Sequence, residues 1–157
     1  VKFASRLQPG VQYRYLRDFG FGTPTGVEYP SESSGRLRRP ANWSKLSSGS
    51  LAMGYEIAVT PLQLAAAYGA LANGGVLMEP HLLREIRGPD GSRLEAREAR
   101  PLRRVVPEDV ALQVTEMLAA VVQDGTATRA SIEKFAVAGK TGTSRRTGAN
   151  GRYIAGS

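Results

Sequence analysis

A run of basic, hydroxyl-bearing and small residues, Ala138–Thr143, is the part of this sequence whose residue types are best suited to chemistry. Alternate side chains of a strand point the same way, so Thr141 and Thr143 would present two hydroxyls from one face. Lys140 would supply a positive charge for a carboxylate or a proton network. Gly142 would let an extended peptide approach the strand closely. One interpretation is therefore a strand edge that binds a peptide.

Two other interpretations compete for the same residues. Gly139-Lys140-Thr141 imitates the end of a phosphate-binding loop, which requires a glycine five residues earlier and a helix directly afterwards. Lys134 occupies the position of that glycine, and Gly142 and Gly148 disfavour a helix, so this interpretation is excluded. A strand in which Lys-Thr-Gly occurs by chance remains open on the motif alone.

The sequence offers no activated nucleophile to accompany this run. A literal Ser-x-x-Lys occurs at Ser131–Lys134, but it lies nine residues before Lys140, in the connector that enters the predicted strand. It therefore cannot face that strand across a cleft, and we expect Ser131 to be an exposed loop residue. His81 is the only histidine, its spacing suggests no serine or aspartate partner, and there are no cysteines. We predict no catalytic residue, no metal site and no cofactor in this chain.

Helix and turn signals outline the elements that must position the run. Thr60, Pro61 and Gln63 form a helix start with a capping box, and Asn73-Gly74-Gly75 is typical of a helix end. The other predicted elements are a helix tail over 1–7 stopped by Pro9-Gly10, a helix over 11–19, a short strand at 27–29, extended chain over 76–86, a hairpin turn at 89–92, a helix from Pro107 to Asp124-Gly125, and antiparallel strands over 135–143 and 152–157.

The net charge of +7 raises the question of a nucleic-acid partner. The basic residues fall in loop-like clusters rather than on one helical face, at Arg36, Arg38 and Arg39, at Arg84 and Arg87, at Arg103 and Arg104, and at Arg145 and Arg146. We therefore expect no nucleic-acid partner, and a solvated basic surface that would suit an anionic wall or membrane nearby. The longest apolar stretch, 62–71, is too short and too interrupted to cross a membrane.

Motifs spread along the chain resemble the class B penicillin-binding proteins. In chain order they are Phe19–Gly22, Thr25-Gly26, Gly35, Gly54–Ala65, Tyr68, Leu71–Gly75, Gly125–Ala127 and the Lys140-Thr141-Gly142 run. Each motif alone is weak, but their order and number are specific. The resemblance implies an α+β, β-lactamase/transpeptidase-like fold, with an antiparallel sheet packed between helices and only part of the domain present.

The same resemblance implies a serine D,D-transpeptidase of the cell wall that cross-links peptidoglycan stem peptides through an acyl-enzyme and binds β-lactam antibiotics. It implies that Lys140, Thr141, Gly142 and Thr143 bind substrate, and that the backbone of Thr143 gives one oxyanion-hole N–H. It also implies a plasma-membrane protein whose transpeptidase domain is extracytoplasmic, with division or elongation membrane proteins as partners. The sequence does not decide between septation and elongation.

Both ends of the sequence suggest a piece of a longer protein. Val1 is not an initiator methionine, and Ser157 falls within a predicted strand. We expect residues 1–157 to be part of one transpeptidase domain, with the nucleophilic serine and its lysine upstream of Val1, so that this chain alone is inactive. Two alternatives remain open: a β-lactamase or β-lactam sensor, and a non-catalytic relative that only binds wall or division partners.

Overall fold

A computed structural model describes residues 2–142 of the chain. Two units make up the chain, Val1–Leu112 and Gln113–Ser157. The helical elements are η1 (Ala4–Arg6), α1 (Pro9–Asp18), η2 (Pro40–Asn42), α2 (Ser47–Ala52), α3 (Pro61–Ala72), α4 (Glu108–Gln123) and η3 (Thr128–Ala130). No helix among residues 2–142 has the length and apolar character needed to cross a membrane.

The described strands form three separate antiparallel pairs. They are β1 (Arg36–Leu37) with β2 (Ile57–Ala58), β3 (Val76–Met78) with β6 (Pro101–Arg104), and β4 (Glu85–Arg87) with β5 (Arg93–Ala96). The predicted extended chain over 76–86 thus contributes one strand before Pro80 and a second strand after it. Helices with antiparallel strands agree with the predicted α+β class.

The start of α3 is built as the sequence predicts. The Thr60 hydroxyl accepts a hydrogen bond from the Gln63 N–H at 3.1 Å, and the Thr60 N–H donates to Gln63 Oε1 at 2.9 Å. Gln63 is fully buried, and its Nε2 also donates to the carbonyls of Thr23 and Ser34, at 2.7 and 2.9 Å. One side chain therefore caps the helix and fastens the 23–34 loop to it.

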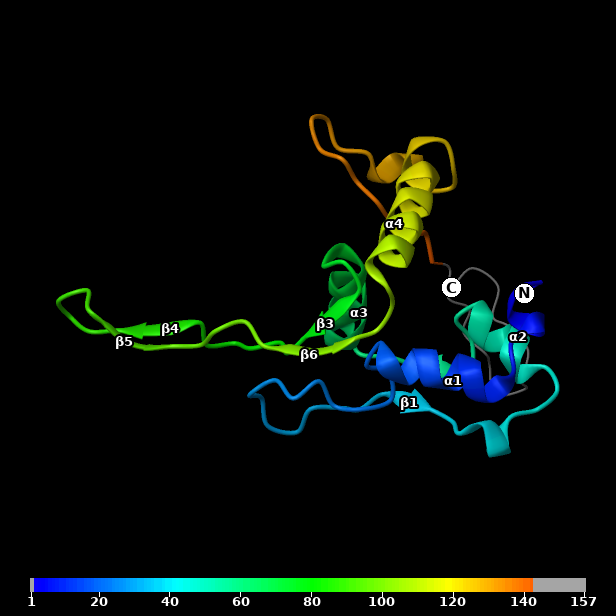
Figure 1. Cartoon of the computed structure of the whole chain (residues 1–157), viewed down its shortest axis with the longest axis horizontal. Coiled ribbons are helices and arrows are strands. Elements are labelled where there is room, and N and C mark those ends of the chain that lie inside the picture. Colours follow the sequence, from blue (N-terminus) through cyan, green and yellow to red (C-terminus); the bar gives the residue numbers. More distant parts are fainter. Residues whose placement is uncertain (1, 143–157) are drawn as a thin grey trace, which may run out of the picture. The chain divides into compact units, whose positions relative to one another are not determined.

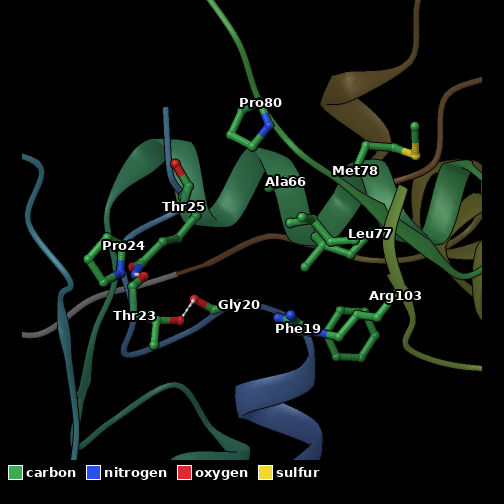
Figure 2. A pocket seen from close by; sticks show the side chains of 12 residues that line it. Phe19, Gly20, Thr23, Pro24, Thr25, Ala66, Leu77, Met78, Pro80 and Arg103 are labelled. Atoms are coloured by element: carbon green, nitrogen blue, oxygen red, sulfur yellow. Dashed lines mark hydrogen bonds between the residues drawn. The ribbon is translucent and has the colours of Figure 1, made fainter. Parts of the chain in front are cut away.

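A small core lies where α3 meets the β3–β6 pair (Figure 1). Ala70, Leu77 and Val105 are buried there, with Phe19 and Ala66 packed against them. Beside this core is a cavity of about 80 Å³, which Figure 2 shows between Phe19, Leu77 and the Gly20–Thr25 loop. Each residue that lines it belongs to the Val1–Leu112 unit, so it includes none of the predicted substrate-binding residues.

The β4–β5 hairpin extends from the end of β3 to the start of β6 (Figure 1). Its turn forms as predicted, with Asp90 Oδ1 accepting from the Ser92 N–H at 3.0 Å and with Gly91 at a φ of +80°. Glu85 pairs with Arg87 at 2.9 Å and with Arg93 at 3.8 Å across the hairpin. The hairpin is thus held by its turn and by neighbouring charges of opposite sign.

Two predictions near the start of the chain are wrong. Pro9, expected to stop a helix, is instead the first residue of α1, where a missing N–H does not matter. The helix tail before it is only the single 3₁₀ turn η1. Residues 27–29 form no strand, because the Tyr29 N–H bonds locally to the Val27 carbonyl at 2.7 Å and no neighbouring strand pairs with them.

Candidate functional site

The C-terminal end of α4 and the turn after it form one side of the candidate site. The Ala127 N–H donates to the Val121 carbonyl at 3.1 Å, which folds the chain back over the last turn of the helix. This turn leaves no room for a side chain at Gly125, because a Cβ there would lie 2.7 Å from the Val121 carbonyl oxygen. Ala127 is buried, whereas Thr126 is exposed beside it.

The segment 131–142 forms the other side of the candidate site. An isolated bridge between Ile132 and Phe135 turns the chain, which then runs back along α4 (yellow to orange in Figure 1). The Gly139 N–H donates to the Leu118 carbonyl at 3.1 Å, and a Cβ at Gly139 would already touch Val122. This contact places the Lys-Thr-Gly run next to the turn that follows α4.

The strand predicted over 135–143 is wrong for the residues that the structure describes. Residues 136–142 belong to no strand pair, since their described backbone partner is a helix carbonyl rather than a neighbouring strand. The last residue of the predicted strand, Thr143, lies outside the described residues, as does its expected partner strand over 152–157. A strand exists only with its neighbour, and the described residues supply none here.

Three side chains meet at this place. Lys140 Nζ lies 2.9 Å from Thr141 Oγ1 and 3.5 Å from Thr126 Oγ1, and it also donates to the Thr141 carbonyl at 3.1 Å. The two threonine hydroxyls are 3.0 Å apart. All three residues are exposed, and no carboxylate among residues 2–142 forms an ion pair with Lys140. An ammonium and two hydroxyls open to solvent are suited to binding an anion.

The structure brings together two of the four predicted site residues, Lys140 and Thr141, and adds Thr126, which belongs to the Gly125–Ala127 motif but was not among the predicted site residues. Gly142 is exposed, with open space where a Cβ would stand. The signal that could have revealed Thr126 is its place directly after Gly125, at the end of a predicted helix. The assignment of substrate binding to 140–143 stays a prediction.

The two rejected catalytic candidates, Ser131 and His81, are both exposed residues. Ser131 is exposed in the 131–135 turn, and no described hydrogen bond joins its hydroxyl to Lys134. His81 is exposed at the base of the β4–β5 hairpin, in an open cleft of about 200 Å³ where Arg100 pairs with Glu79 at 3.2 Å. Within the described part of the chain, no cluster of three potential metal-binding side chains occurs.

Carboxyls in the other unit take structural roles. The Leu82 N–H donates to Glu28 Oε2 at 3.1 Å, and this hydrogen bond holds the pKa of Glu28 below its usual value. Arg97 also pairs with Glu28, so this carboxylate links the 23–34 loop to the base of the hairpin. These charges hold local structure and present no acid–base pair of the kind that activates a serine.

Comparison with known proteins identifies the class of this chain. The family described as the penicillin binding protein transpeptidase domain matches residues 1–156. The chain therefore belongs to this family, and the predicted resemblance to penicillin-binding proteins is confirmed.

Among the similar proteins is penicillin-binding protein PbpB of Mycobacterium tuberculosis, 38% identical over 154 residues that cover 93% of this chain and 22% of that protein. Stage V sporulation protein D of Bacillus subtilis is 31% identical over 156 residues, which cover 98% of this chain and 24% of that protein. The chain thus spans about a quarter of the length of the curated relatives it matches.

Solved structures give the same result for the fold. Penicillin binding protein 3 from Mycobacterium tuberculosis, complexed with ampicillin, matches with a TM-score of 0.86 and 35% identity over 98% of this chain and 36% of that one. The transpeptidase domain of penicillin-binding protein 3 from Burkholderia pseudomallei matches with a TM-score of 0.82 and 29% identity, over 98% of this chain and 44% of that one. The predicted β-lactamase/transpeptidase-like fold is therefore confirmed.

Proposed function

We propose that the protein containing this chain is a peptidoglycan D,D-transpeptidase, and that this chain supplies the part of its site that holds the substrate's terminal carboxylate. The observation that carries the proposal is the exposed cluster of Lys140 with the hydroxyls of Thr141 and Thr126. Relatives named probable peptidoglycan D,D-transpeptidase, such as PbpC of Pseudomonas aeruginosa at 32% identity, support the reaction class.

In the proposed reaction, a serine outside this chain attacks the carbonyl carbon between the two D-alanines of a stem peptide. The peptide C–N bond breaks, the terminal D-alanine leaves with a proton on its amine, and an acyl-serine remains. An amine of a second stem peptide then takes the acyl group and restores the serine. Lys140 and Thr141 would hold the terminal carboxylate throughout the first step, and Thr143 would help to align the peptide and donate to the oxyanion.

β-Lactams would enter the same site, because they carry a carboxylate near the carbonyl that the serine attacks. The penicillin binding protein 3 structure named above was solved with ampicillin, which supports this part of the proposal for a related chain. We further propose that the domain works outside the plasma membrane, next to division or elongation proteins. That location and those partners rest on the family resemblance.

Covalent labelling by a fluorescent penicillin tests the proposal. The longer protein that contains this chain is compared with the 157-residue chain alone. We expect labelling of the longer protein only, and a rate about tenfold or more lower in its Lys140→Ala variant, because a charge-assisted contact to the carboxylate is lost.

Each other outcome would support a different interpretation of the chain. A longer protein that is folded but unlabelled would point to the non-catalytic alternative. Rapid release of hydrolysed penicillin, with little stable adduct, would point to the β-lactamase alternative. Labelling of the short chain would reinstate Ser131 as a candidate nucleophile.

A further inference from the structure

The hydroxyl of Thr141 has a limited number of hydrogen-bonding positions. A threonine hydroxyl can accept two hydrogen bonds and donate one. Lys140 Nζ lies 2.9 Å from Thr141 Oγ1 and, as an ammonium, can only donate to it. The Thr126 hydroxyl lies 3.0 Å from the same oxygen, and either hydroxyl of this pair can be the donor. The direction of that one hydrogen bond therefore decides where the Thr141 proton points.

If Thr126 donates, both acceptor positions of Thr141 are filled and its own proton must point elsewhere. If Thr141 donates instead, its proton is spent on Thr126 and cannot reach a ligand. Lys140 Nζ also lies 3.5 Å from Thr126 Oγ1, so the ammonium can donate to the Thr126 oxygen. The proton of the Thr126 hydroxyl then stays available for donation to Thr141. An anion placed against Thr141 would select the first arrangement, because only that arrangement offers it a donor.

We propose that Thr126 is a positioning residue for substrate binding: it donates to Thr141 Oγ1, so that the Thr141 hydroxyl proton is directed at the carboxylate of a bound peptide or β-lactam. This inference rests on the proposed function, in which Lys140 and Thr141 bind that carboxylate. A ligand that covers these exposed groups excludes water, which strengthens the hydrogen bonds between them. Thr126 thus acts through Thr141 and does not touch the reacting atoms.

Local backbone structure explains how Thr126 is held in place. Gly125 packs directly against the backbone of Val121, and Ala127 bonds to the Val121 carbonyl at 3.1 Å. On the other side, the Gly139 N–H donates to the Leu118 carbonyl at 3.1 Å, which fixes the position of the chain directly before Lys140. Two backbone anchors, one on either side of the cluster, therefore set the separation of the two hydroxyls.

The test measures the second-order acylation rate of the longer protein by benzylpenicillin and by its methyl ester, which lacks the negative charge. We expect Thr126→Val to lower the rate with benzylpenicillin about tenfold and to leave the rate with the ester almost unchanged. Thr126→Ser keeps the hydroxyl and should restore the benzylpenicillin rate to within about twofold. Thr128→Val removes a hydroxyl from an exposed threonine of η3 and serves as the matched control.

The possible results are distinct. Equal losses with both compounds, or no loss with benzylpenicillin, would overturn the positioning role. A loss that Thr126→Ser does not repair would also overturn it, since the hydroxyl would then not be the active feature. If the unchanged protein reacts with neither compound although it is folded, the proposed function itself fails, and this inference fails with it.

Discussion

The amide nitrogen of Gln63 lies 2.7 Å from the carbonyl oxygen of Thr23, forty residues earlier in the chain, and the Gln63 side chain has no exposed surface. The same amide group bonds to the Ser34 carbonyl and to the Thr60 N–H. A helix start, a loop and the entry to β1 therefore share one buried side chain. Its loss would leave three backbone groups without their partner.

We expect Gln63→Met, which keeps the length of the side chain but makes none of these bonds, to lower the free energy of unfolding by about 3 kcal/mol. Gln113→Met is the control, because Gln113 is exposed on α4 and should tolerate the change within about 0.5 kcal/mol. Urea unfolding of both variants measures the difference. Equal losses for the two variants would contradict the role given to Gln63.

A glycine can be needed for its positive φ or for the close approach of a neighbouring group, and Gly75 and Gly91 differ in the second of these. Both have positive φ, +86° and +80°, but a Cβ at Gly75 would collide with the Val106 carbonyl, whereas Gly91 has open space. We expect Gly91→Ala to cost about 1 kcal/mol from backbone strain alone. Gly75→Ala should cost about 3 kcal/mol, because overpacking adds to the strain. Thermal unfolding of the two variants would show whether the close approach at Gly75 matters.

Gly125→Ala should disturb the candidate site by moving Thr126. Its Cβ would lie 2.7 Å from the Val121 carbonyl oxygen and 2.8 Å from the Val121 Cα, so the turn must shift. We expect the acylation rate by benzylpenicillin to fall about tenfold or more, with a loss of stability of about 1–3 kcal/mol. Gly10→Ala, where a Cβ meets nothing within 4 Å, should change neither quantity appreciably.

Glu56 gives a prediction for pH. The Ser47 hydroxyl donates to Glu56 Oε2 at 2.8 Å, Arg38 pairs with the same oxygen, and together they lower the pKa of Glu56 from 4.5. A lowered folded-state pKa stabilises the fold above the unfolded pKa, and this stabilisation is lost as the pH falls through the folded-state pKa. The gap in unfolding free energy between the unchanged protein and Glu56→Gln should therefore be present at pH 7 and shrink below about pH 4.

Glu95→Gln is the matched control for that measurement, because Glu95 is an exposed residue of β5. Its stability gap should be small at both pH values. A Glu56 gap that stays constant from neutral to acid pH would mean that packing of the side chain, rather than its charge, accounts for the effect.

Local signals predicted α3 and the hairpin turn because their causes lie within a few residues. The capping box joins Thr60 to Gln63, and the turn depends on Asp90, Gly91 and Ser92. Pro9 was misinterpreted because proline both ends a helix and fits its first turn, and the sequence alone does not distinguish the two.

The candidate site was predicted in part. The motifs contain Lys140, Thr141 and Thr126, but Thr126 lies fourteen residues before Lys140, and their contact depends on the turn after α4. The strand over 135–143 is not settled by local sequence, because strand pairing depends on a distant neighbour. The expected neighbour, 152–157, lies outside the described residues, and the Gly139 N–H bonds to the helix carbonyl of Leu118. Sequence patterns miss contacts between residues that are far apart in the chain and that only the folded structure brings together.

The turn at 131–135 has a practical consequence. Lys134 has a φ of +69° and is exposed, and the neighbouring Phe135 is 73% exposed, so this tip is open to trypsin. Cleavage after Lys134 would leave Thr126 and Lys140 on separate polypeptides. Among the described residues, these two pieces are joined by the Ile132–Phe135 bridge, by the hydrogen bond from Gly139 to Leu118, and by the contacts of Thr126 with Lys140 and Thr141. A nicked protein that still reacts with penicillin would show that those contacts hold the two halves together without the peptide link.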